Sequence, residues 1–297
     1  MKVLRTPDER FAGLPGYPWA PRYTEVDGLR VHHVEDGPAD ADPVLLLHGE
    51  PTWSYLYRHM IPVLAGAGHR AVAPDLVGFG RSDKPAERGA YSYAAQVEWT
   101  AAWIAAAGLR RITLVCQDWG SLIGLRLVAE HPDRFARVVV ANGFLPTGDR
   151  GVPPVFRAWQ AFARWSPWFP AGWIVQAGST RRLSSGERAA YDAPFPSAAY
   201  KAGARALPVL VPLESDDPAA PANRRAWEVL RAWDRPFLTA FGDRDPVFRG
   251  ADRVLQREVP GAAGQPHTVL RGAGHFVQED RGPELARIAA DFIARTP

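Results

Sequence analysis

The run ITLVCQDWGSLIG, at residues 112–124, places an acidic side chain where an apolar segment ends. The apolar residues predict a buried strand, and the glycine and small residues that follow predict a tight turn into a helix. This is the shape of a nucleophile elbow, whose usual pattern is G-x-S-x-G with the reactive residue in the middle. Here Asp118 holds the middle position and Cys116 the first. Because aspartate also caps helix N-termini, the run alone leaves both roles open for Asp118.

A carboxylate in the nucleophile position would change the class of reaction. Serine must lose a proton as it attacks, whereas the carboxylate of Asp118 is already ionised at pH 7. It could therefore displace a leaving group from a saturated carbon and form an alkyl-enzyme ester, which a base-activated water would hydrolyse. Alkyl halides and epoxides offer such a carbon. Ordinary esters react at a carbonyl carbon instead and are not the expected substrates.

One of the eight histidines stands where such a base is needed. His275 lies in RGAGHF, a glycine-rich segment after the last predicted strand, and it follows the nucleophile and an acid in the chain order typical of this constellation. Asp245, in GDRDP, follows the preceding predicted strand and would orient the imidazole. Asp243 in the same turn competes for that role, but a short acidic side chain there would more naturally bond to the loop backbone.

A second glycine turn, in LLLHGEPTW at residues 45–53, predicts donors for the negative charge of the reaction. In this constellation the loop after the strand supplies one backbone N–H, and the residue after the nucleophile supplies another. We therefore expect the N–H groups of Glu50 and Trp119 to form the oxyanion hole. The side chain of Glu50 should point towards the pocket, where an unpaired charge would be costly.

Short apolar runs that alternate with helix-like stretches must position these residues. A parallel sheet that is covered on both faces has strands that are apolar at consecutive positions, as these runs are. The predicted strands are Val44–Leu47, Arg70–Pro74, Ile112–Cys116, Val138–Ala141, Phe237–Phe241 and His267–Leu270. The predicted helices are Tyr55–Ala67, Ala94–Ala107, Ser121–Glu130, Arg224–Trp233, Gly250–Arg257 and Pro283–Ala294. The alternation favours an α/β fold with a mostly parallel central sheet flanked by helices.

The alternation stops in the second half of the chain, where helical pieces occur without a convincing strand. We expect residues 145–221 to form a helical cap inserted into a main domain of residues 1–144 and 222–297, with Asp216–Ala222 as the returning linker. The predicted cap contains Trp159, Trp165, Trp168 and Trp173. Because so many tryptophans on a surface would favour aggregation, we expect them to be buried against the main domain.

The composition is that of an ordinary globular protein, with 297 residues, 46% hydrophobic and 23% charged. The formal net charge of +3 comes from 35 basic and 32 acidic residues, and these are interleaved, so nothing predicts a nucleic-acid site. Cys116 is the single cysteine, which excludes a disulfide within the chain.

Further sequence signals bear on location and cofactors. The first twenty residues carry charges and prolines where a signal peptide would be apolar, and no apolar run has the length to cross a bilayer. We therefore expect a cytoplasmic protein without a membrane partner. The histidines show no metal-ligand spacing, and the chain has no Gly-rich phosphate loop, so we expect neither a metal nor a cofactor.

Four motifs together resemble the haloalkane dehalogenases of the α/β-hydrolase superfamily. They are HGEPTWSYLYR, APDLVGFGRSDKP, QDWGSLIG and GHFVQE, and their order and spacing agree with that family from about Tyr17 to the final helix. The pattern is most similar to the branch with an aspartate–histidine–aspartate triad and two halide-binding tryptophans. GFGRSD alone occurs across the superfamily, whereas HGEPTW combined with QDWG is much more specific.

The resemblance implies an α/β-hydrolase fold with an inserted helical cap, and it implies a role for each candidate residue. Asp118 would be the nucleophile, His275 the base and Asp245 its acidic partner. The indole N–H groups of Trp119 and of one cap tryptophan would hold the departing halide, on which negative charge develops. Trp159 fits the early position in the cap best, with Trp165, Trp168 and Trp173 as competitors.

The implied activity is hydrolysis of a haloalkane to a primary alcohol and a halide ion, a detoxification reaction that needs water and no cofactor. We expect a monomer, and the resemblance implies that its partners are a small apolar halogenated substrate, water and halide. Epoxide hydrolysis is the alternative, since it shares the aspartate nucleophile and would use cap tyrosines such as Tyr191 and Tyr200 as proton donors. A non-catalytic hydrolase-fold binder is the remote alternative, although this chain keeps all three triad residues.

Overall fold

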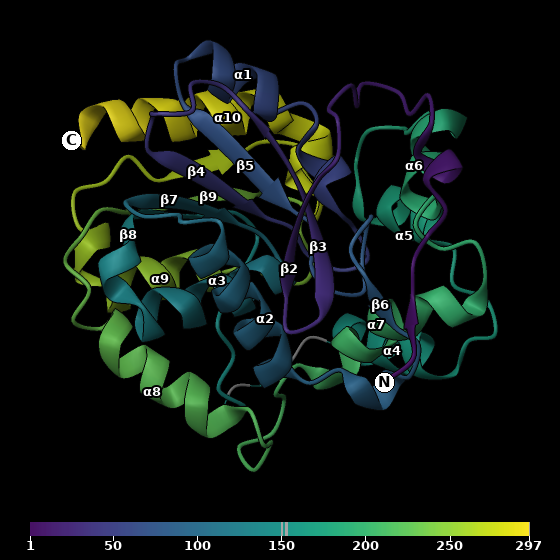
Figure 1. Cartoon of the computed structure of the whole chain (residues 1–297). Coiled ribbons are helices and arrows are strands. Elements are labelled where there is room, and N and C mark those ends of the chain that lie inside the picture. Colours follow the sequence, from purple (N-terminus) through teal and green to yellow (C-terminus); the bar gives the residue numbers. More distant parts are fainter. Residues whose placement is uncertain (150, 152–153, 297) are drawn as a thin grey trace.

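Eight strands form one sheet through the middle of the molecule (Figure 1). The structure is a computed structural model and describes residues 1–149, 151 and 154–296. The spatial order of the strands is β10-β9-β8-β7-β4-β5-β3-β2. Their bounds are β2 Arg22–Val26, β3 Leu29–Asp36, β4 Pro43–Leu47, β5 Arg70–Pro74, β7 Ile112–Cys116, β8 Phe135–Val140, β9 Phe237–Gly242 and β10 Thr268–Leu270. From β10 to β5 all neighbours are parallel, which confirms the predicted α/β fold with a mostly parallel sheet.

Two antiparallel strands at one end of the sheet were not predicted. β2 and β3 form a hairpin, and β3 pairs antiparallel with β5. Their sequences, RYTEV and LRVHHVED, mix polar and apolar residues because one side of each strand faces outwards. A consecutive-apolar criterion therefore misses them. A further pair, β1 (Val3–Leu4) and β6 (Lys84–Pro85), forms a separate two-stranded sheet.

Helices cover both faces of the main sheet. In Figure 1, α1 and α10 lie above the sheet, and α2, α3, α8 and α9 lie below it. The bounds are α1 Ile61–Gly66, α2 Tyr93–Ala106, α3 Trp119–Glu130, α8 Ala220–Leu230, α9 Ala251–Glu258 and α10 Val277–Arg295. The predicted helix Tyr55–Ala67 is wrong in part. Residues Ser54–Tyr57 form a 3₁₀ turn and the α-helix begins only at Ile61, where Pro62 can occupy the first turn without losing a hydrogen bond.

The segment between β8 and β9 is helical wherever the structure describes regular elements in it. Its α-helices before α8 are α4 Pro154–Trp165, α5 Ala171–Gly178, α6 Ser185–Asp192 and α7 Ala202–Ala206. They lie together at the right of Figure 1, beyond the ends of the central strands. The end of the predicted linker Asp216–Ala222 is already helical, because α8 begins at Ala220.

The expected burial of the cap tryptophans is wrong for three of the four. Trp165, Trp168 and Trp173 are exposed to 76%, 64% and 53%, and Trp159 is half-buried. The helices α4 to α7 and the described residues between them, called the cap below, bury other apolar side chains instead, among them Phe169, Val175, Leu183 and Tyr191. These side chains satisfy the need for a buried cap face, so the outer tryptophans have no apolar surface to cover them.

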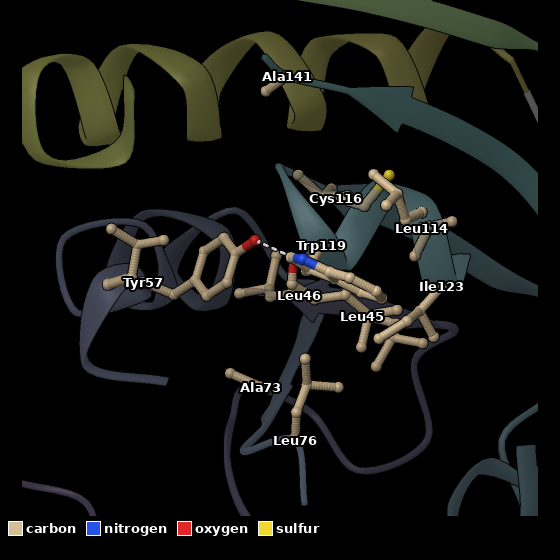
Figure 2. Packing of buried hydrophobic residues seen from close by; sticks show 14 of the residues in the cluster. Leu45, Leu46, Tyr57, Ala73, Leu76, Leu114, Cys116, Trp119, Ile123 and Ala141 are labelled. Carbon is tan, nitrogen blue, oxygen red and sulfur yellow. Dashed lines mark hydrogen bonds between the residues drawn. The ribbon is translucent and has the colours of Figure 1, made fainter. Parts of the chain in front are cut away.

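The core lies around the two central strands, β4 and β7. Leu45, Leu46 and Leu114 are fully buried, and Figure 2 shows them packed near the indole of Trp119. Cys116 is also fully buried there, and burial raises the pKa of its thiol well above the ordinary value. A thiol in such surroundings is inert, which agrees with a structural role for this residue. In the described part of the chain, no helix is both long enough and apolar enough to cross a membrane.

Candidate active site

The loops that leave the carboxyl ends of four parallel strands meet at one edge of the sheet. Glu50 follows β4, Asp118 follows β7, Asp245 follows β9 and His275 follows β10. Parallel strands bring these loops to the same edge, where open α/β sheets bind their ligands. The structure thus brings together the candidate nucleophile, base, acid and backbone donor that the sequence suggested.

Asp118 occupies a tight turn between β7 and α3. Its backbone has φ 51° and ψ −126°, a conformation that L-residues rarely adopt and that costs about 1–3 kcal/mol. Two glycines make the turn possible. A Cβ atom on Gly120 would lie 2.0 Å from the carbonyl oxygen of Leu47, and one on Gly49 would lie 2.3 Å from Oδ1 of Asp118. The turn therefore has the strained geometry of an elbow that presents one side chain at the sheet edge.

Backbone donors hold the carboxylate of Asp118. The N–H of Glu50 donates to Oδ1 of Asp118 at 2.8 Å, and the N–H of Trp119 also donates to this carboxylate. Burial raises the pKa of Asp118, and the charge of His275 and the two backbone bonds only partly oppose that effect. The two N–H groups predicted as an oxyanion hole thus converge on one carboxylate.

His275 lies between two carboxylates. Its Nδ1 is 3.3 Å from both oxygens of Asp245, and its Nε2 is 3.7 Å from Oδ2 of Asp118. Burial favours the neutral imidazole, but the charge and hydrogen bond of Asp245, with the charge of Asp118, raise the pKa of His275. Phe248 stacks on the imidazole at 5.9 Å between ring centroids. Asp243, the competing acid, instead accepts the backbone N–H of Gly272.

Gln117 contacts the same imidazole and was missed by the sequence analysis. Its Nε2 lies 3.2 Å from Nε2 of His275 and donates to the carbonyl of His275 at 3.2 Å. An amide donor beside Nε2 favours the tautomer that carries its proton on Nδ1, towards Asp245. Its position next to the nucleophile in the sequence is the signal that could have marked Gln117.

Asn142, which follows β8, was missed as well. Its side-chain amide donates to the carbonyls of Gly274 and His275 at 2.7 and 3.0 Å, and its Oδ1 accepts the N–H of Gly242 at 2.7 Å. Its own carbonyl accepts the N–H of Asp118. One buried amide therefore joins the loops that carry the candidate nucleophile, acid and base. A polar residue after the apolar run VVVA is the sequence signal for such a position.

A cavity of about 260 Å³ opens against Asp118. Its wall is mainly apolar and comes from both the main domain and the cap: Trp119, Leu122, Phe144, Pro146, Phe156, Val211, Pro212, Leu213, Val247, Phe248 and Val254. Polar groups in the wall are few, and the carboxylate of Asp118 is the only acidic group among the described lining residues. Such a cavity suits a small apolar molecule.

The two candidate halide-binding tryptophans are placed differently. Trp119 lines the cavity beside Asp118, and within the described residues no acceptor takes its indole N–H. Trp159 is not in the cavity wall, because its ring packs against Phe162 and Phe169 at centroid distances of 5.6 and 5.8 Å. α4 contributes Phe156 to the wall, one helical turn before Trp159.

The two cap tyrosines considered as epoxide-activating donors do not reach this cavity. Tyr191 is fully buried, and its hydroxyl donates to Glu279. Tyr200 is half-buried and also absent from the cavity wall. Neither hydroxyl therefore lies where a substrate beside Asp118 could receive its proton.

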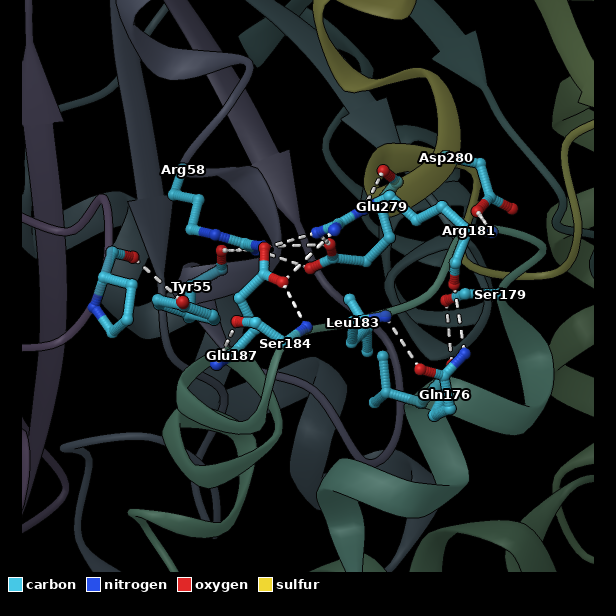
Figure 3. A network of polar contacts seen from close by, with 12 residues as sticks. Tyr55, Arg58, Gln176, Ser179, Arg181, Leu183, Ser184, Glu187, Glu279 and Asp280 are labelled. Carbon is cyan, nitrogen blue, oxygen red and sulfur yellow. Dashed lines mark hydrogen bonds and ion pairs between the residues drawn. The ribbon is translucent and has the colours of Figure 1, made fainter.

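A buried network of charges ties the cap to the main domain. Glu279, at the start of α10, accepts from Arg58 of the main domain and from Arg181 of the cap (Figure 3). It also accepts from the hydroxyl of Tyr191 in the cap. His59, Glu187 and Glu279 have ligand atoms close enough together to hold a metal ion. Two guanidinium groups already neutralise these carboxylates, so the network functions as an ion-pair cluster without needing a cation.

Comparison with known proteins agrees with this arrangement. The family model for the alpha/beta hydrolase fold matches residues 42–282. A haloalkane dehalogenase of Mycolicibacterium paratuberculosis is 58% identical over 96% of this chain and 96% of its own length. The haloalkane dehalogenase of Psychrobacter cryohalolentis is 54% identical, with both chains covered completely. The chain belongs to the haloalkane dehalogenases.

Solved structures lead to the same family. The haloalkane dehalogenase DpaA from Paraglaciecola agarilytica NO2 superposes with a TM-score of 0.90 at 36% identity, covering 99% of this chain and 98% of that chain. The resemblance seen in the sequence motifs is thereby confirmed, as is the α/β-hydrolase fold. DpaA is described as tetrameric, so the expected monomeric state of this chain stays a prediction.

Proposed function

We propose that the chain hydrolyses haloalkanes in two steps, with an ester of Asp118 as the intermediate. The observation that carries the proposal is the position of the Asp118 carboxylate, which backbone N–H groups hold against an apolar cavity with His275 on its other side. A buried carboxylate that faces an apolar cavity can attack carbon without competing water, and it has no proton to lose.

In the first step Oδ2 of Asp118 attacks the carbon that carries the halogen. The new C–O bond forms as the C–X bond breaks, and its electron pair leaves with the halide. Trp119 is the proposed donor to that halide, because its indole lies in the cavity wall beside the carboxylate. Trp159 is proposed as the second donor, which requires its ring to turn from Phe162 and Phe169 towards the cavity. Neutral donors stabilise the developing charge and still allow the ion to leave.

In the second step His275 takes a proton from water, and the hydroxide oxygen attacks the ester carbon of Asp118. The N–H groups of Glu50 and Trp119 stabilise the negative oxygen that forms. The bond between the carboxyl carbon and the alkyl oxygen then breaks, this oxygen takes the proton from His275 and leaves as the alcohol, and the carboxyl group of Asp118 loses its proton to water and is again a carboxylate. Asp245 holds the imidazole and stabilises its charged form. Esterification removes the charge of Asp118, which is one cause of the raised pKa of His275. Once the ester has formed, the pKa of His275 is therefore lower, and its imidazole is more readily neutral when it must accept the proton of water.

The proposed sequence consumes only substrate and water, so no metal or cofactor is required. Epoxide hydrolysis would use the same nucleophile, but it needs acids near the epoxide oxygen. The positions of Tyr191 and Tyr200 outside the cavity wall therefore favour dehalogenation. Small apolar halogenated molecules are the proposed substrates, and removal of toxic haloalkanes in the cytoplasm is the proposed role.

A paired assay tests this function. Halide release from short 1-bromo- and 1-chloroalkanes is measured in parallel with diol formation from epoxides of similar size. We expect turnover of the haloalkanes at rates at least about a hundredfold above the epoxides, because only the former produce a separate anion for the indole donors. Diol formation without halide release would contradict the proposal, and so would inactivity on both panels.

A further inference from the structure

The exposed tryptophans of the cap form an apolar segment on the surface. Residues Trp165–Trp173, with the sequence WSPWFPAGW, contain no charged residue and run from the last residue of α4 into the first turn of α5. Trp165 and Trp168 are exposed to 76% and 64%. Ser166 is the only hydroxyl-bearing residue, and its hydroxyl is used internally, since it donates to the carbonyl of Trp168 at 2.6 Å. Tryptophans left this exposed in one short segment mark an interaction surface.

Arginines surround this segment, and acidic residues are missing from the sequence around it. From residue 151 to residue 186 the chain has four arginines and no aspartate or glutamate. The guanidinium of Arg164 lies over the ring of Trp165 at 5.3 Å, and that of Arg188 lies over Trp173 at 4.4 Å. Among the described residues, no carboxylate pairs with either arginine. Arg157 and Arg181 pair with glutamates, so the positive charge next to the tryptophans comes from Arg164 and Arg188.

This face is also continuous with the approach to the cavity. A surface groove beside α4 is lined by Arg164 and Trp165, and by Val211 and Leu213 from the segment after α7. The groove is also lined by Glu214, which pairs with Arg157, and by Asp217. Val211 and Leu213 also line the cavity at Asp118. Any partner that bound the Trp165–Trp173 segment would therefore lie next to the wall of the cavity at Asp118.

We propose that the Trp165–Trp173 segment and its flanking arginines dock the enzyme on an anionic lipid bilayer. Tryptophan prefers the boundary between lipid and water, and arginine binds lipid phosphates. An interface between two proteins contains about one hydrogen bond per 100–200 Å² of buried surface. The side chains of this segment offer almost no hydrogen-bonding group besides the indoles, so a protein partner is disfavoured. If a second copy of the chain bound through the same surface, two positively charged faces would meet and repel each other. The contact is peripheral and needs no membrane-spanning helix.

The docking also has a consequence for the substrate, although it does not depend on the proposed reaction. Small haloalkanes are apolar and dissolve in lipid. An enzyme whose cavity wall lies at a bilayer would meet them where they concentrate. The sequence led us to expect no membrane partner, because no apolar run has the length to cross a bilayer. A peripheral contact through exposed tryptophans needs no such run, and the structure places three cap tryptophans on the surface.

Co-sedimentation of the full chain with lipid vesicles tests the proposal. Vesicles of equal phosphatidylglycerol and phosphatidylcholine are compared with pure phosphatidylcholine, at low and high salt. We expect binding to the anionic vesicles that weakens at high salt, because exposed charges are screened. The double variant Trp165→Ser/Trp168→Ser should bind at least about tenfold more weakly. Arg164→Gln should lose about fivefold on anionic vesicles only.

The matched control is Val229→Ser/Val269→Ser, which removes two exposed apolar side chains from the main domain and should leave vesicle binding unchanged. Circular dichroism and halide release in vesicle-free buffer check that each variant is folded. Absence of wild-type binding to anionic vesicles would overturn the proposal, whatever the turnover measurements show. A concentration-dependent dimer that the double tryptophan variant abolishes would also overturn it, because a second copy would then cover this face.

Discussion

At the scale of single residues, the chemistry depends on the charge of two neighbours. Asp118 must be ionised to attack, and His275 must be neutral to accept a proton from water. The charge of Asp118 raises the pKa of His275, and the charge of His275 lowers the pKa of Asp118, because Oδ2 and Nε2 are only 3.7 Å apart. The pair is therefore best understood as one coupled unit, in which esterification of the first residue prepares the second.

Asp118→Asn tests this coupling. The amide carries no charge, so we expect the pKa of His275 to fall relative to wild type, and we expect halide release to be lost. NMR titration of the histidine rings without substrate measures the pKa, with His275→Phe identifying the signal. Mass spectrometry checks that the introduced amide has not deamidated. An unchanged or raised pKa of His275 would show that the two groups are not coupled as proposed.

Trp159→Phe tests the second proposed halide donor. We expect the saturable quenching of tryptophan fluorescence by bromide to weaken at least about threefold, because one of two N–H donors is lost. Trp173→Phe is the control, since this exposed residue can contribute only non-saturable quenching. An unchanged bromide titration in the Trp159 variant would leave Trp119 as the donor and place the second donor elsewhere.

Residue types singled out three side chains that the structure brings close together, and their roles as a triad stay a prediction. Asp118, Asp245 and His275 stand out in the sequence because each is a polar residue after an apolar strand. The contacts of Gln117 depend on where the loop after β10 returns, which no local pattern contains. The packing of Trp159 against Phe169 likewise depends on how α4 and α5 meet.

At the scale of elements, the site exists because four parallel strands end at one edge. Consecutive apolar residues predicted β4, β5 and β7 nearly to the residue. The hairpin of β2 and β3 was missed, although Asp27-Gly28 between them is a strong turn signal and both residues have positive φ, 50° and 73°. That hairpin lies at the far end of the sheet order from β10, so its omission did not affect the site.

Asn142→Ala tests the link between these loops. The substitution removes two donated bonds and one accepted bond, and leaves buried backbone groups unpaired. We expect the free energy of unfolding in urea to fall by about 3 kcal/mol. Thr268→Ala, which removes a surface hydroxyl bond at the same end of the sheet order, should cost about 0.5 kcal/mol or less. Equal effects of the two variants would contradict a central role for Asn142.

At the scale of the whole molecule, one buried carboxylate joins the cap to the main domain. Glu279 binds Arg58 on one side and Arg181 and Tyr191 on the other. Burial raises its pKa, but these partners outweigh burial and lower the pKa below the ordinary 4.5. A lowered folded-state pKa means that the stabilisation is complete above the unfolded-state pKa and is lost as the pH falls through the folded value.

Glu279→Gln should therefore destabilise the protein by about 3 kcal/mol at pH 7, since it removes one of the two carboxylates that pair with the buried guanidinium of Arg58 and the half-buried guanidinium of Arg181, and leaves them only Glu187. The difference from wild type should shrink as the pH falls below about 4.5. Urea unfolding at several pH values measures both. Glu284→Gln, at an exposed position of the same helix, is the control and should change little. A destabilisation that does not vary with pH would contradict the assigned role of the charge.

The covalent intermediate on Asp118 is the central claim, and the variant His275→Phe tests it most directly. Without the base, the first displacement should proceed and the ester should persist. After mixing with a short 1-bromoalkane, we expect one bromide released per chain and a mass increase of one alkyl group on the peptide that contains Asp118. Continued bromide release, or an unmodified Asp118 after the first turnover, would contradict the mechanism.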